Sequence, residues 1–74
     1  MMDAMKKAFD DAVDKIEDVY DDINRIFNNV CVEMRATKGK EREEYCDYAD
    51  LLSSAMECIN LARVLVDYVK RKKS

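Results

Sequence analysis

The chain has 74 residues and a formal net charge of −3, with 39% charged and 49% hydrophobic residues. This composition is typical of a small folded domain rather than a disordered tail, and no apolar run is long enough for a membrane span. Histidine is absent, and the three cysteines form no C-x-x-C pair, which argues against a metal site or a disulfide framework. We therefore expect no cofactor or metal. The N-terminal residues resemble no export signal, so we expect a cytoplasmic location.

The distribution of helix-breaking residues predicts two long helices joined by one turn. Proline is absent, and the single glycine, Gly39, lies near the middle of the chain between Lys38 and Lys40. A glycine just past a helix end often adopts the left-handed conformation that stops the helix, and nearby lysines complement the helix dipole. We expect an all-α hairpin in one domain over residues 1–74. Its helices would cover about residues 3–36 and 40–71, with a turn at about 37–39.

The first predicted helix carries a seven-residue apolar repeat with three apolar columns. With Met2 as heptad position a, column a continues with Phe9, Ile16, Ile23 and Val30, column d holds Met5, Ala12, Val19 and Ile26, and column e holds Val13, Tyr20, Phe27 and Met34. A two-stranded coiled coil needs only columns a and d. The third column makes the apolar face wide enough to contact two neighbouring helices.

The second predicted helix continues the repeat and is apolar on nearly all sides toward its end. Column a holds Tyr45, Leu52, Ile59 and Val66, column d holds Tyr48, Ala55, Ala62 and Val69, and the flanking columns add Ala49, Met56, Leu51, Cys58 and Leu65. Within residues 58–69 the only polar side chains are Asn60, Arg63 and Asp67. One partner helix cannot cover such a surface. We therefore expect a homo-oligomeric bundle, with a four-helix dimer as its simplest form.

Acidic side chains follow the polar side of the first helix. This acidic stripe consists of Asp10, Asp14, Glu17, Asp18, Asp21 and Asp22. Acids near a helix N-terminus can simply be a solvated face that suits the dipole, and carboxylates at this spacing can also hold a divalent cation. A long negative stripe fits a basic protein surface by charge complementarity. We predict that the stripe binds a basic protein partner.

A second acidic series begins the second helix, with one acid at every third position. It consists of Glu41, Glu44, Asp47 and Asp50. In this respect the chain resembles the all-α nucleotide pyrophosphatases of the MazG type, which use paired acidic motifs to bind a cation. The second acidic motif of that family is not recognisable here. The resemblance implies a metal-dependent nucleotide hydrolase, which is our third hypothesis.

A basic run occupies residues 70–73, Lys-Arg-Lys-Lys. Such a run can bind phosphates or an acidic membrane surface, and it also complements a helix C-terminus. In an antiparallel hairpin it lies next to Asp3, Asp10 and Asp11, which would neutralise part of its charge. Because the net charge is also negative, we do not expect nucleic-acid binding.

The three cysteines are expected to be reduced. In a hairpin that turns midway between them, Cys31 and Cys46 lie at the same level, but both point away from the helix contact. A disulfide between them is therefore not expected. Cys58 lies at the edge of the apolar face, where we expect a small core residue.

The second helix begins with an Arg-Glu start and later carries an alanine and an asparagine, in the residues Arg42-Glu43-Glu44, Leu52, Ala55 and Asn60. In these residues it resembles the helical hairpin of oligomeric phage proteins that sequester cyclic-nucleotide immune signals. The tryptophan that follows the asparagine in that family is absent, and the spacing from the arginine differs by one. The resemblance implies a pocket between subunits for a small phosphorylated ligand, lined by Asn60, Arg63 and Tyr68.

These features favour a non-enzymatic, acidic, oligomeric binding module of the size of a phage or mobile-element accessory protein or inhibitor. It would act through protein–protein contact, and we assign no catalytic residue. Sequestration of a phosphorylated ligand is the alternative function.

Overall fold

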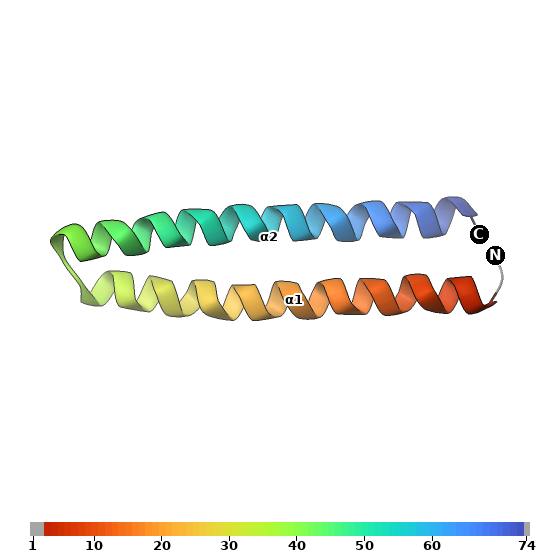
Figure 1. Cartoon of the computed structure of the whole chain (residues 1–74), viewed down its shortest axis with the longest axis horizontal. Helices are drawn as coiled ribbons and strands as arrows, with labels where there is room; N and C mark the ends of the chain where they lie inside the picture. Colours follow the sequence, from red (N-terminus) through yellow and green to blue (C-terminus); the bar gives the residue numbers. More distant parts are fainter. Residues whose placement is uncertain (1–2, 74) are drawn as a thin grey trace.

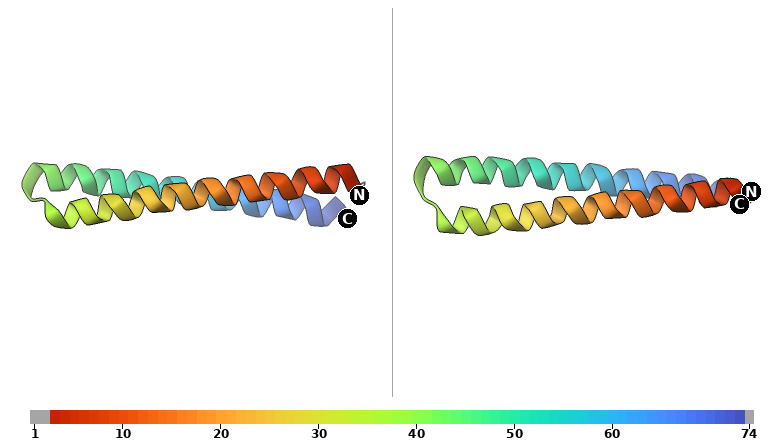
Figure 2. Two further views of the ribbon diagram at one scale, coloured as in Figure 1. Left: turned by 90° about the horizontal axis from the view of Figure 1, so that it is seen from below. Right: turned by 60° about the horizontal axis from the view of Figure 1, so that its bottom comes forward.

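The described part of the chain is an antiparallel hairpin of two long helices. The computed structural model describes residues 3–73, as α1 (Asp3–Ala36) and α2 (Gly39–Lys73) (Figure 1). The predicted bounds agree with these to within two residues, so the all-α hairpin is confirmed. Met2, the first predicted a position, lies outside the described residues. The Cα atoms extend over 56 × 15 × 10 Å, and the two helices cross at a shallow angle (Figure 2).

The turn between the helices is built from a side-chain cap and a glycine. The hydroxyl of Thr37 donates to the carbonyl oxygens of Glu33 at 3.0 Å and Met34 at 3.4 Å, which have no partner further along α1. Gly39 has a φ of 65°, the left-handed conformation in which a Cβ is strained. No atom lies within 4 Å of the place a Cβ would take. Backbone conformation, rather than space, therefore requires glycine here.

The two helices meet through columns a and e, not through all three apolar columns. Partly or fully buried residues in these columns are Phe9, Val13, Ile16, Tyr20, Ile23, Phe27, Val30 and Met34 of α1, and Tyr45, Ala49, Leu52, Met56, Ile59 and Val66 of α2. In column d of α1, by contrast, Met5, Val19 and Ile26 are about half exposed. Two columns are enough for one partner helix, so the third remains uncovered.

Much of the apolar surface of the hairpin is open to solvent. Ala49, with 9% exposure, is the only buried residue among those described. The large apolar side chains that remain between 42% and 69% exposed are Met5, Val19, Ile26, Val32, Tyr48, Leu51, Leu61, Val64, Leu65, Tyr68 and Val69. A folded domain normally encloses its core side chains almost completely. Two helices alone cannot do this, because each covers only one side of the other.

The hairpin has a polar face and an apolar face on opposite sides of the helix contact. Three side-chain contacts between the helices, Glu17–Arg63, Asp10–Lys70 and Met34–Cys46, each join a b position to an e position and lie on the polar face. Around each helix, column d lies next to column a on the side away from column b. In an antiparallel pair the d columns of both helices therefore face the same side of the hairpin. The apolar face consists of Met5, Ala12, Val19 and Ile26 of α1, and Tyr48, Leu51, Ala55, Cys58, Ala62, Leu65 and Val69 of α2.

The pairing between the helices corrects two expectations about the cysteines. Cys46 Sγ lies 3.1 Å from Met34 Sδ, so its side chain meets that of Met34 instead of Cys31. In all three contacts the two residue numbers add up to 80, which is more than the sum for Cys31 and Cys46. The sum is larger because each Cα–Cβ bond tilts toward the N-terminus of its own helix, so a side chain contacts a residue further along the other helix. All three cysteines are free, as predicted. Cys58 is exposed and is not a core residue of the hairpin, because its column lies outside the helix contact.

Candidate functional site

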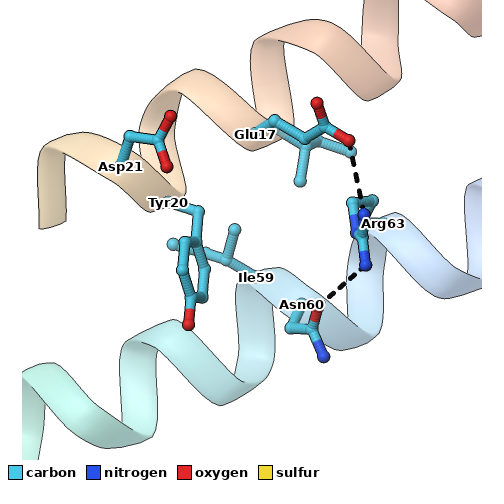
Figure 3. A pocket seen from close by; sticks show the side chains of 7 residues that line it. Glu17, Tyr20, Asp21, Ile59, Asn60 and Arg63 are labelled. Atoms are coloured by element: carbon cyan, nitrogen blue, oxygen red, sulfur yellow. Dashed lines mark hydrogen bonds and ion pairs between the residues drawn. The ribbon is translucent and has the colours of Figure 1, made fainter. Parts of the chain in front are cut away.

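A shallow cavity of about 320 Å³ opens on the polar face near the middle of both helices (Figure 3). It is lined by Ile16, Glu17, Tyr20, Asp21, Ile59, Asn60 and Arg63. Ile16, Tyr20 and Ile59 occupy columns a and e, so they supply its apolar base. The polar residues of the lining surround this base. The cavity thus combines an apolar floor with charged and amide groups, the usual composition of a small-ligand site.

Arg63 joins the two helices at the edge of this cavity. Its Nη1 donates to Glu17 Oε1 at 3.3 Å, and its Nη2 donates to Asn60 Oδ1 at 3.4 Å (Figure 3). The two charged side chains are 44% and 49% exposed, so solvent screens their attraction. Exposed pairs of this kind contribute about 0.2–1 kcal/mol to stability. The principal effect of the pair is to orient the guanidinium group.

The structure brings together two of the three residues predicted to bind a ligand. Asn60 and Arg63 line the cavity, whereas Tyr68 does not. The ring of Tyr68 is exposed, and Lys72 Nζ lies 5.8 Å from its centroid. Sequence reasoning assigned no ligand role to Tyr20 and did not pair Glu17 with Arg63. The apolar repeat already placed Tyr20 in column e, but the pairing depends on how the two helices are aligned.

The acidic stripe divides into acids that pair and acids that remain open. Asp10 pairs with Lys70, Glu17 pairs with Arg63, and Asp22 pairs with Arg25. The other three members, Asp14, Asp18 and Asp21, are exposed and form no ion pair within residues 3–73. These three carboxylates are the part of the stripe that is available to another molecule.

The basic run at the end of α2 is largely engaged within the hairpin. Lys70 pairs with Asp10, one of the three acids of α1 expected beside the run. Arg71 Nη2 lies 2.8 Å from Asp67 Oδ2, one turn earlier on α2. These contacts leave less of the positive charge for an external phosphate or membrane surface.

The acidic series of α2 does not converge on one point. Within the described range, no three His, Cys, Asp or Glu side chains are placed to hold a metal ion together. Glu41, Glu44, Asp47 and Asp50 are all exposed along successive turns. Neither helix, over the residues described, combines the length and hydropathy needed to cross a bilayer.

Comparison of the chain with known protein families, characterised proteins and solved structures finds no match. Its function is therefore inferred from its own surfaces and charges.

Proposed function

We propose that the hairpin is a non-catalytic binding module that assembles with copies of itself through the apolar face and binds a basic protein through the acidic stripe. The observation that carries this proposal is the separation of the two surfaces. Seven of the eleven large exposed apolar side chains lie on the apolar face, while the carboxylates of Asp14, Asp18 and Asp21 project from another side of α1. Self-assembly would cover the first surface and leave the second accessible.

Self-assembly is supported by the amount of apolar surface that the hairpin leaves in water. Leu51 is 69% exposed and Leu65 is 55% exposed on the apolar face. Burial of apolar surface contributes roughly 25 cal/mol per Å², and contiguous exposed patches of this kind are typical of interfaces. A four-helix bundle made of two hairpins would bury both d columns and build the core that a single copy lacks.

Binding of a basic partner is supported by the three acids that pair with nothing in the hairpin. Asp14, Asp18 and Asp21 follow one another at intervals of three and four residues, so they form a continuous negative row along the outside of α1. A basic surface would approach this row faster and bind it in a preferred orientation, since complementary charge steers encounter. The expected attraction weakens with salt because these groups are exposed.

The absence of a catalytic role is part of the proposal. General acid–base chemistry relies on groups held at fixed positions, usually in a site that excludes water. The carboxylates of the acidic series in α2 and of the acidic row in α1 lie on open helix surfaces instead. Their arrangement fits recognition of a partner better than activation of a nucleophile.

A second candidate function is sequestration of a small phosphorylated ligand. It is supported by the position of Asn60 and Arg63, which share the cavity on the polar face. The carboxylates of Glu17 and Asp21 line the same cavity, so an anionic ligand would have to separate Arg63 from Glu17. This cost makes sequestration the weaker of the two proposals.

Affinity capture with matched charge variants tests the main proposal. A triple variant, Asp14→Lys, Asp18→Lys and Asp21→Lys, reverses the open acids, and Glu41→Lys, Glu43→Lys and Glu44→Lys is the control with the same charge change on α2. We expect wild type and control to retain one basic protein from cells that make the chain, identified by mass spectrometry, and the stripe variant to lose it. Circular dichroism should show equal helix content in all three proteins. Equal capture by the stripe variant would contradict the assigned surface.

A further inference from the structure

We infer that the apolar face is the interface of a symmetric homodimer whose twofold axis runs across the hairpin, so that α2 packs antiparallel on α2 of a second copy. This inference rests on the self-assembly proposed above and specifies its geometry. Two hairpins packed face to face have one other symmetric arrangement, with the axis along their length, and that arrangement places α2 on α1 of the second copy.

The apolar residues of α2 are arranged almost symmetrically about Cys58. In order away from it, the pairs are Ala55 and Ala62, then Leu51 and Leu65, then Tyr48 and Val69. In a twofold interface residue i meets j and residue j meets i, so an antiparallel helix pair needs a pattern that reads alike in both directions. The small central residues allow close approach of the two helices, and the larger ones fill the space on either side.

Two of the three large exposed residues in column d of α1 are centred at the same level, and the third, Met5, lies nearer the N-terminus. Val19 and Ile26, which are 47% and 51% exposed, are centred between residues 22 and 23. The cross-helix contacts pair residues whose numbers total 80, so the side chain of Cys58 on α2 lies level with that of Asp22 on α1. A transverse axis level with Cys58 therefore passes between Val19 and Ile26 of α1.

The charge distribution along α2 fits the same axis. Within α2, residues 39–56 carry five acids and two bases, whereas residues 57–73 carry two acids and five bases. An antiparallel pair of α2 helices places the negative half of each beside the positive half of the other.

The size of the face also fits a second copy. The Cα trace of the hairpin is 56 by 15 Å on this side, a projected area comparable to the roughly 800 Å² that each partner contributes to a standard protein interface. A helix of another protein would cover only part of the width of this face, whereas a second hairpin would cover all of it.

Distances between spin labels on the two copies test the axis. The native cysteines are replaced (Cys31→Ser, Cys46→Ser, Cys58→Ala), and one label is attached through either Asp47→Cys, near the turn, or Glu57→Cys, near the axis. In the transverse dimer, the two labels at position 47 should lie about 30 Å apart, from the rise of 1.5 Å per residue along α2. The labels at position 57 should be close together. Pulsed electron paramagnetic resonance measures both distances.

The two positions separate failure of the geometry from failure of self-assembly. With the axis along the length, both positions would give about 14 Å, the diagonal of a bundle whose helices pack 8–10 Å apart. Short distances at both positions would therefore overturn the transverse axis and leave the dimer intact. The absence of any distance between copies at position 57, with a monomer in sedimentation equilibrium, would overturn the self-assembly as well.

Discussion

Individual residues of this hairpin gain their roles from where the two helices place them. Arg63 is a cation in an apolar stretch of sequence, and the structure uses it to link Glu17 and Asn60 across the polar face. Thr37 and Gly39 have equally local roles, because together they end α1 and redirect the chain into α2. Most other residues near the turn are exposed and tolerate substitution on physical grounds.

At the residue scale, Gly39→Ala should destabilise the hairpin. Its φ of 65° is a conformation that costs a residue with a Cβ about 1–2 kcal/mol, and no neighbouring atom obstructs the added methyl group. We expect the free energy of unfolding to fall by this amount, measured by urea titration at one protein concentration. Asn tolerates the left-handed conformation better, so Gly39→Asn should cost less. Equal stability of all three proteins would show that the turn relaxes to another conformation.

The two helices differ in how they distribute their apolar residues. α1 is strongly amphipathic, with a stripe of acids opposite its apolar columns, and its surface can be divided into a covered side and a solvated side. α2 carries exposed apolar residues on several sides, and adjacent positions such as Val64 and Leu65 are 50% and 55% exposed. In an isolated hairpin, Val64 and Leu65 are about equally exposed to solvent. In a dimer through the apolar face, Leu65 would be buried and Val64 would stay exposed.

At the element scale, Leu65→Glu and Val64→Glu should therefore have different effects. Leu65 belongs to the apolar face, so a glutamate there would bury an unpaired charge in the dimer, and we expect the dimer dissociation constant to rise at least tenfold. Val64 lies on the side of α2 away from that face, so Val64→Glu should leave the constant within about twofold, as surface changes do. Sedimentation equilibrium measures both. Equal weakening by the two variants would place the interface elsewhere on α2.

The whole molecule is a rod with an apolar side, a polar side and an uneven charge along its length. Two long helices have only one line of contact, and almost none of the described residues is buried. Chains of this size usually gain their remaining stability from disulfides, metals or association. The exposed apolar face is the reason that we propose association as this source.

At the scale of the whole molecule, native mass spectrometry of gently purified protein should give twice the 8.6 kDa chain mass with nothing added. Added mass of a small molecule, lost in Arg63→Ala while the dimer persists, would instead support the ligand candidate. Arg35→Ala, on α1 and outside both the cavity and the apolar face, is the control for that loss. A chain that remains monomeric at micromolar concentration would contradict self-assembly.

The helices can be predicted from the amino-acid sequence, because the lack of proline, the single glycine and the seven-residue apolar repeat all act locally and favour a hairpin. The sequence also identified the apolar columns and the acidic stripe, since both follow from helical periodicity. The structure is needed to see that columns a and e form the helix contact while the large residues of column d stay exposed, that Glu17 pairs with Arg63, and that Cys46 meets Met34. These features depend on the rotation and alignment of one helix against the other. Both are set by the sum of many side-chain contacts between the two helices, which no local pattern specifies.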